Sequence, residues 1–162
     1  MAAALTMPVL RQELAMKRFR CSAAIALILA GCSTVPSMSD SARLALYKAH
    51  AGAPVPSFRY LGRLDSWEAL GDEAIAVWTR PRQAWLLELS GVCGNLEFSP
   101  VIGLTNQLGE VHAGFDKVLV RDSSPINIPC WIRTIRPLDV NAIREAEHAA
   151  RVAASPPSPG AY

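Results

Sequence analysis

Short apolar segments separated by turn residues fill the middle of the chain, and they restrict its fold more than any other feature. Residues 73–79 and 84–89 are rich in strand formers, and Pro81 lies in the turn sequence between them, residues 80–83. Such a pair predicts a β-hairpin with at least one buried face. Further strands are expected within 57–71, 101–107, 109–114, 116–121 and 130–138. Short strands at this spacing predict a mainly β fold, a small antiparallel barrel or sandwich.

The sequence pattern changes after residue 138. The alanine-rich stretch 138–154 predicts one C-terminal helix capped by Asp139 or Asn141, and residues 155–162 are expected to be a disordered tail. The chain has 162 residues, which is room for one domain. We divide it into four parts: upstream residues with a signal peptide (1–31), a lipidated tether with at most one or two helical turns (32–57), a small β domain (58–138), and the helix with its tail (139–162).

A basic and then apolar segment near the N-terminus has the features of a secretory signal peptide. Lys17, Arg18 and Arg20 precede an apolar run, residues 21–31, that ends in small residues. The run is about half as long as a transmembrane helix requires. We expect Met16 to be the start residue. Without the residues before Cys32 the net charge changes from +2 to about −1, so no basic patch indicates nucleic-acid binding.

The end of the apolar run, Leu29-Ala30-Gly31-Cys32, resembles a bacterial lipobox. The resemblance implies cleavage before Cys32, attachment of diacylglycerol to its sulfur, and acylation of the new amino terminus by a chain such as palmitate. Two or more acyl chains anchor a protein stably to a membrane. Ser33 stands where an aspartate is associated with retention in the inner membrane. The resemblance therefore implies an outer-membrane anchor with the domain facing the periplasm.

Two of the four cysteines remain once the targeting segment is set aside. Cys21 leaves with the signal peptide and Cys32 carries the lipid, which leaves Cys93 and Cys130. In an oxidising compartment this pair predicts a disulfide that closes a loop of roughly 40 residues and stabilises the domain by roughly 4 kcal/mol. The alternative is a reactive Cys93 with His112 as its base, in a small envelope hydrolase or thiol-redox protein. The sequence around Cys93, Gly-Val-Cys-Gly-Asn, has no signature of that chemistry.

An acidic cluster is a second candidate for catalysis. Its members lie in residues 65–73, which the pattern predicts to be a turn: Asp65, Glu68, Asp72 and Glu73. A pair of carboxylates could supply an acid and a base, or bind a hard cation. The simpler interpretation, which we favour, is that they are solvated turn residues.

No metal or cofactor is indicated by the sequence. The histidines His50, His112 and His148 have no ligand spacing between them, and the remaining cysteines lack the four-ligand pattern of a zinc site. No glycine-rich phosphate loop follows a predicted strand.

The four tryptophans are many for so small a domain. Trp78 and Trp85 flank the 80–83 turn, and we expect them to face each other across the hairpin as cross-strand packing. The alternative is an aromatic surface that has arginines close to it, Arg133 among them. Such a surface would contact a glycan, a peptide or an envelope protein. The candidate residues of that surface are Trp67, Trp78, Arg80, Arg82, Trp85 and Trp131.

Three elements of the domain resemble a known family. They are Asp65-Ser66-Trp67, the Leu-Leu-Glu-Leu segment at residues 86–89, and the pattern Cys-x-Ile-x-x-Ile-x-x-Leu that begins at Cys130. With the lipobox, they resemble small proteobacterial envelope proteins classed as domain of unknown function 6491, over residues 58–139. That family has no established activity, so the resemblance implies fold and compartment and no catalytic residue. We interpret the chain as an outer-membrane lipoprotein that is a non-enzymatic binding or structural module.

Overall fold

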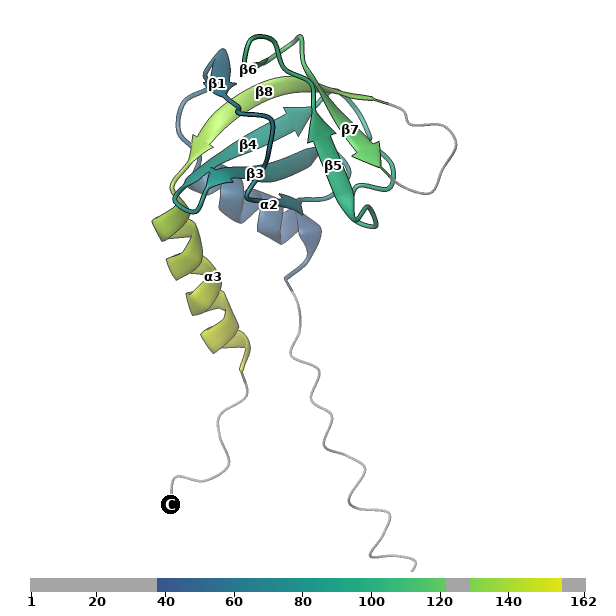
Figure 1. Ribbon diagram of the computed structural model, residues 1–162. Helices are drawn as coiled ribbons and strands as arrows, with labels where there is room; N and C mark the ends of the chain where they lie inside the picture. The colour runs from purple at the N-terminus through teal and green to yellow at the C-terminus, as the bar shows by residue number, and fades with distance from the viewer. Residues whose placement is uncertain (1–37, 122–128, 156–162) are drawn as a thin grey trace, which may run out of the picture. The chain divides into compact units, whose positions relative to one another are not determined.

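The computed structural model describes residues 38–121 and 129–155 (Figure 1). The chain divides into two units, Met1–Val35 and Pro36–Tyr162, and every described residue belongs to the second. The predictions about the signal peptide, Cys32 and the tail after residue 155 lie outside the described residues.

Six strands form one antiparallel sheet in the order β2-β3-β4-β8-β7-β5, and this sheet curls into a half-barrel (Figure 1). The strands are β2 (Ser66–Ala69), β3 (Ala74–Arg80), β4 (Gln83–Leu89), β5 (Val101–Leu104), β7 (Lys117–Arg121) and β8 (Cys130–Leu138). A second, two-stranded sheet pairs β1 (Ser57–Arg59) with β6 (Glu110–His112). The mainly β prediction is confirmed.

The predicted hairpin and the predicted last strand are present. β3 and β4 are joined by Pro81 and Arg82, and β8 spans the predicted residues 130–138. The stretch 57–71 differs from its prediction, because it contains two strands, β1 and β2, rather than one strand followed by a turn. The acidic cluster is therefore not on one turn: Glu68 lies in β2, which pairs with β3.

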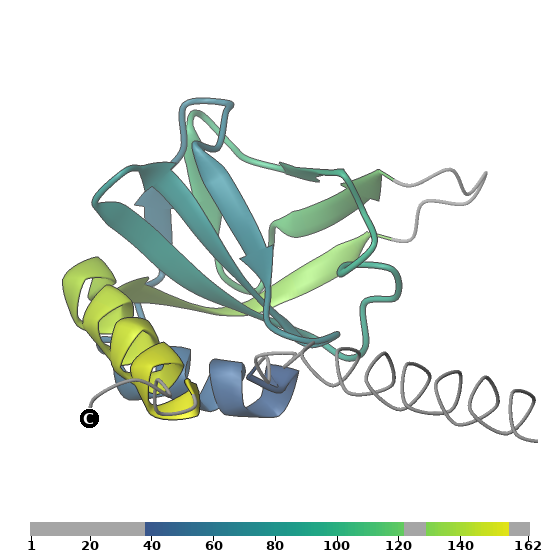
Figure 2. The same ribbon diagram turned by 90° about the horizontal axis from the view of Figure 1, so that it is seen from below.

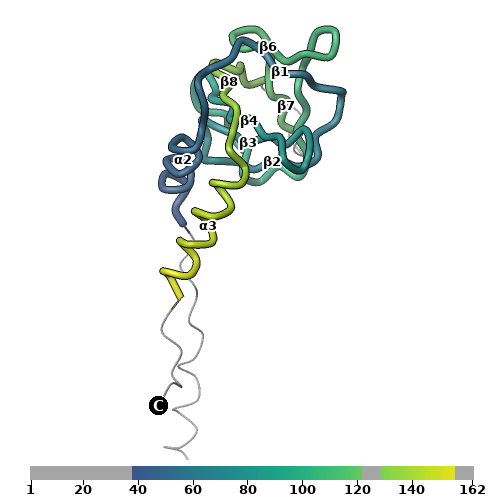
Figure 3. Tube along the Cα trace, turned by 90° about the vertical axis from the view of Figure 1, so that its left-hand side faces the viewer, coloured from purple at the N-terminus to yellow at the C-terminus, as the bar shows by residue number. Residues whose placement is uncertain are grey.

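Two helices cover the outer face of the half-barrel, α2 (Asp40–Ala49) and α3 (Val140–Ala154) (Figure 2). Ser39 caps α2 through its hydroxyl, which accepts from Ala42 N, and Asp139 caps α3 as predicted. Figure 3 shows both helices on one side of the half-barrel.

The tether predicted for residues 32–57 is wrong over its second half. Tyr47 of α2 is only 2% exposed, and residues 51–55 then run along β8, where Val55 N donates to Ile135 O at 2.9 Å. Among the described residues, packing against the sheet therefore already begins at α2. Ser, Ala and Pro dominate the sequence of this segment, and this composition is typical of a tether. Three apolar side chains, Leu44, Leu46 and Tyr47, nevertheless pack α2 against the sheet.

Both faces of the central strands are buried, in two separate cores. Ile75 and Val77 of β3 point into the half-barrel with Leu87 of β4, whereas the alternating residues Ala74 and Ala76 point toward the helices. The small alanines let the helices approach the sheet closely. Each large aliphatic side chain buried in this way contributes about 1.5–3 kcal/mol.

Candidate functional site

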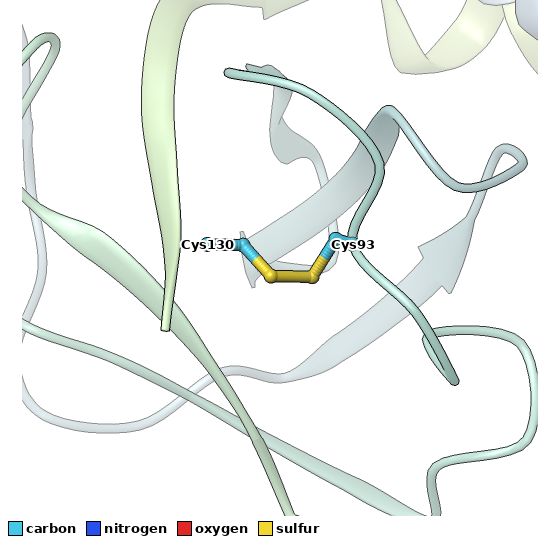
Figure 4. The surroundings of a disulfide bond; sticks show 2 residues. All are labelled: Cys93 and Cys130. Carbon is cyan, nitrogen blue, oxygen red and sulfur yellow. A yellow bond between two sulfur atoms is a disulfide. The ribbon is translucent and has the colours of Figure 1, made fainter. Parts of the chain in front are cut away.

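Cys93, in the loop after β4, and Cys130, at the start of β8, form the predicted disulfide (Figure 4). Their Cα atoms lie 5.8 Å apart, and the Cys93 side chain is buried. Cys93 N donates to Asp72 O at 2.8 Å, which ties this loop to the β2–β3 turn. In the bridged form Cys93 has no thiolate, so this geometry gives no support to its alternative role as a nucleophile.

Trp78 and Trp85 do not face each other, contrary to the prediction. Trp78 pairs with Ala84 and Trp85 pairs with Val77, so the two rings lie on opposite faces of the sheet. The cause is a bulge between Trp78 and Arg80. One additional residue in a strand shifts the register, and a shift of one residue moves a side chain to the other face.

The four tryptophans of the expected aromatic surface lie in different environments. Trp85 stacks on Phe58 inside the half-barrel, with ring centroids 5.0 Å apart, and Trp67 packs against the same core. Trp78 meets Tyr47 edge-on beneath the helices. Trp131 is exposed on β8, where Lys117 Nζ lies 4.1 Å from its ring centroid. The six predicted surface residues are therefore not brought together on one face.

A tyrosine–carboxylate cluster, made of Arg43, Tyr47, Glu68 and Glu147, joins α2, β2 and α3. The Tyr47 hydroxyl donates to Glu68 Oε2 at 2.7 Å and to Glu147 Oε1 at 3.1 Å. Arg43 Nη1 lies 3.1 Å from the other Glu68 oxygen. Burial raises the pKa of the Tyr47 phenol, and the hydrogen bond to Glu68 and the negative charge of the two carboxylates raise it further.

The predicted acidic residues divide between two places. Asp65 and Glu68 border one small pocket of about 240 Å³ together with Glu147 of α3, whereas Asp72 and Glu73 are exposed in the β2–β3 turn. Glu68 is already engaged by Arg43 and Tyr47. Of the four predicted carboxylates, Glu68 is therefore the one that contacts side chains of a helix in the described residues.

The histidines are separate from one another. His112 of β6 lies between two carboxylates, with Nδ1 3.5 Å from Asp116 Oδ2 and Nε2 3.6 Å from Glu110 Oε2. His50 caps the C-terminus of α2, and His148 is exposed on α3. Within residues 38–121 and 129–155 no group of three or more His, Cys, Asp or Glu side chains is placed to hold a metal ion.

An arginine pocket opens at the end of the β3–β4 hairpin. Its volume is about 350 Å³, and its lining residues are Arg59, Leu61, Arg63, Thr79, Arg80 and Gln83. Arg59 ends β1, Arg63 lies in the connection to β2, and Arg80 ends β3. The three arginines are exposed. Arg80 was predicted as a surface candidate, whereas Arg82, at the turn, does not line the pocket.

In the part of the chain that the structure describes, no neighbouring carboxylate neutralises the positive charge of the arginine pocket. Among the residues that the structure describes, none of its three guanidinium groups forms an ion pair. Glu110 is the strand partner of Arg59, but its carboxylate contacts Ser57 and His112 instead. As far as the described residues go, the lining holds donors and no carboxylate, imidazole or thiol. Its chemistry is therefore suited to holding an anion.

Sequence reasoning missed Arg59 and Arg63 of this pocket, and Arg43, Tyr47 and Glu147 of the cluster. A local signal existed for Arg59, which alternates with the buried Phe58 and Tyr60 and must therefore point away from the core. No local signal places Arg59 next to Arg80.

Comparisons with known proteins identify a family and nothing closer. No curated protein and no solved structure matches the chain. In the described part of the chain, neither helix is long and apolar enough to cross a membrane. The match to the family extends over residues 15–154, which is wider than the 58–139 of the resemblance and includes both helices. On this match the chain belongs to the family of unknown function DUF6491.

Proposed function

We propose that this protein is a lipid-anchored, non-enzymatic binding module of the bacterial envelope. Cys32 carries the acyl chains that hold it in the outer membrane, and the half-barrel faces the periplasm, where it binds an envelope component such as a glycan or a protein. The observation that carries the binding function is the arginine pocket, an exposed site whose three guanidinium groups form no ion pair with any residue that the structure describes.

The composition of this pocket favours binding over catalysis. General acid–base chemistry near neutral pH requires a group such as histidine or a carboxylate within hydrogen-bond reach of the substrate. The described lining offers arginine, threonine, glutamine and leucine. Arginine stays protonated at all ordinary pH values, so it donates hydrogen bonds without exchanging protons.

Two observations support the anchor and the compartment. A disulfide such as Cys93–Cys130 is typical of proteins outside the cytosol, because the cytosol keeps thiols reduced. The basic and apolar segment that ends at Cys32 lies inside the part of the chain that the family match covers. Both agree with export followed by lipidation.

The test is the intact mass of the protein extracted from membranes and alkylated without reductant. We expect a chain that begins at Cys32, carries acyl groups and takes up no alkyl group. A mature chain without acyl groups would contradict the anchor. Alkylation of Cys93 and Cys130 would instead favour the thiol-redox or hydrolase alternative.

A further inference from the structure

We propose that the arginine pocket binds a phosphate group. This inference rests on the proposed function, because it names the ligand class of the binding module. It begins from the three guanidinium groups of Arg59, Arg63 and Arg80, which line one pocket and have no described carboxylate partner. Like charges held together repel one another, and a bound anion removes that repulsion.

The pocket is held in place by the backbone on both of its sides. On one side, Arg59 lies between Phe58 and Tyr60, which are both buried, and Tyr60 N donates to Gly109 O at 2.8 Å. The β1–β2 connection that carries Arg63 is hydrogen-bonded to β3, where Asp65 N donates to Trp78 O at 2.8 Å. The arginines are therefore presented by fixed backbone, which lowers the entropic cost of binding a ligand.

The hairpin side of the pocket is fixed by α3. Arg144 Nη2 donates to Pro81 O at 3.2 Å, directly between Arg80 and Gln83. The Thr79 hydroxyl lies within hydrogen-bond distance of both Gln83 Oε1, at 3.3 Å, and Gln83 O, at 3.5 Å, and this contact leaves the N–H groups of the Gln83 amide available as donors. Both sides of the pocket thus present donors.

The number of donors and charges selects phosphate over a carboxylate. A carboxylate has one charge and two oxygens, which one guanidinium can satisfy in a bidentate pair. A phosphate monoester carries up to two charges and three terminal oxygens, which match several guanidinium forks. The volume of about 350 Å³ lies at the small end of the range for ligand sites.

Leu61 adds an apolar contact at the same pocket. Its side chain is 76% exposed, although it lines the site with the three arginines. An exposed leucine beside a cationic site suits a phosphate whose substituent is apolar, such as a lipid headgroup with its acyl chain. A free phosphate ion would use the arginines alone.

The experiment is calorimetric titration of the full-length protein in neutral detergent at pH 7 and low ionic strength. The two probes are inorganic phosphate and dihexanoylphosphatidic acid, a soluble short-chain lipid. We expect wild type to bind at least one probe, and the combined variant R59Q/R63Q/R80Q to lose about 100-fold or more in affinity. The matched control is Arg133→Gln, which removes an exposed arginine of β8 outside the pocket and should leave the affinity within two-fold.

The two probes distinguish the source of the phosphate. Equal affinity for both identifies the phosphate group alone as the ligand, whereas a lipid preference that Leu61→Ser abolishes identifies a lipid headgroup. Absence of binding to both probes, or unchanged affinity in the folded triple variant, would overturn the inference. An intact mass that matches the lipidated chain, together with no phosphate binding, would refute phosphate as the ligand and retain the lipid-anchored module. The two proposals can therefore fail separately.

Discussion

The domain contains two charged regions that are built in opposite ways. In the tyrosine–carboxylate cluster, Glu68 is engaged by both Arg43 and the Tyr47 hydroxyl, and the same hydroxyl also reaches Glu147. In the arginine pocket, no guanidinium group has a described ionic partner. The cluster is half-buried or buried, whereas the arginines of the pocket are exposed.

This difference separates polar groups that hold the fold from polar groups that are available to a ligand. The cluster takes its members from α2, β2 and α3, so every contact in it fixes a helix to the sheet or to the other helix. A buried polar group without a partner costs more free energy than an exposed one, so the fold satisfies the cluster internally. The exposed arginines remain solvated and need no partner for folding. Substitutions in the first region should therefore reduce stability, and substitutions in the second should reduce binding.

The largest expected effect is that of Tyr47→Ala. The Tyr47 ring is 2% exposed and packs edge-on against Trp78, so its removal leaves a cavity between α2 and the sheet. We expect the free energy of unfolding to fall by about 3–5 kcal/mol. The matched variant is Arg80→Ala in the pocket, for which we expect a change within about 0.5 kcal/mol. Urea titration of both proteins measures the difference, and comparable losses in the two would contradict the comparison.

Tyr47→Phe tests the hydroxyl alone and has a smaller expected effect. The ring stays, but Glu68 and Glu147 lose their shared donor, which should cost about 1–2 kcal/mol near neutral pH. The pH dependence is more specific. Above the ordinary phenol pKa, near 10, the unfolded chain releases the Tyr47 proton while the folded chain retains it, because the folded pKa is raised. The free energy of unfolding should therefore fall as the pH rises above about 10.

The control for this pH dependence is the second buried tyrosine in the described residues, Tyr60. Burial also raises the pKa of Tyr60, so wild type has a contribution from each residue, and Tyr47→Phe retains only that of Tyr60. We expect a shallower loss of stability with pH in the variant than in wild type, measured by urea titration between pH 9 and 11. Parallel slopes would show that the Tyr47 hydroxyl is not the group that the carboxylates hold in its protonated form.

The parts of this fold that depend on neighbouring residues were predictable, and the parts that depend on distant pairing were not. The β3–β4 hairpin follows from two apolar runs around Pro81, and the C-terminal helix follows from its composition and the Asp139 cap. The prediction for Trp78 and Trp85 failed through a single additional residue. In a regular hairpin these two would have been directly opposite, but the bulge shifts the register by one and places them on opposite faces.

The two charged regions lie beyond such local reasoning. The arginine pocket depends on the β1–β2 connection meeting the end of β3, and the cluster depends on two helices from opposite ends of the domain meeting at β2. The amino-acid composition shows that arginines and carboxylates are present. Which of them form ion pairs with each other depends on the order of the strands in the sheet. The disulfide was predictable for a different reason, since it follows from the number of cysteines and from the oxidising compartment that the N-terminal sequence predicts.

The smallest expected effects come from one substitution made in both regions, arginine to glutamine. Arg43→Gln removes the partner of Glu68 and the donor to Ala69 O, and should cost about 1 kcal/mol because the side chain is partly exposed. Arg63→Gln removes a cation whose described surroundings contain further cations and no ionic partner, so we expect no loss and a gain of at most about 0.5 kcal/mol.

The ionic strength and the phosphate content of the buffer determine how clearly the stabilities of Arg43→Gln and Arg63→Gln differ. Urea titration at low ionic strength without phosphate should show the small gain of Arg63→Gln, since salt screens the repulsion between exposed charges. Addition of phosphate should make wild type more stable than Arg63→Gln, because an anion that binds only the folded pocket stabilises wild type, with three arginines, more than the variant, which keeps two. Arg43→Gln should keep the same deficit in both media. A loss of stability in Arg63→Gln without phosphate would mean that this arginine has a structural partner, and the distinction between the two regions would not hold.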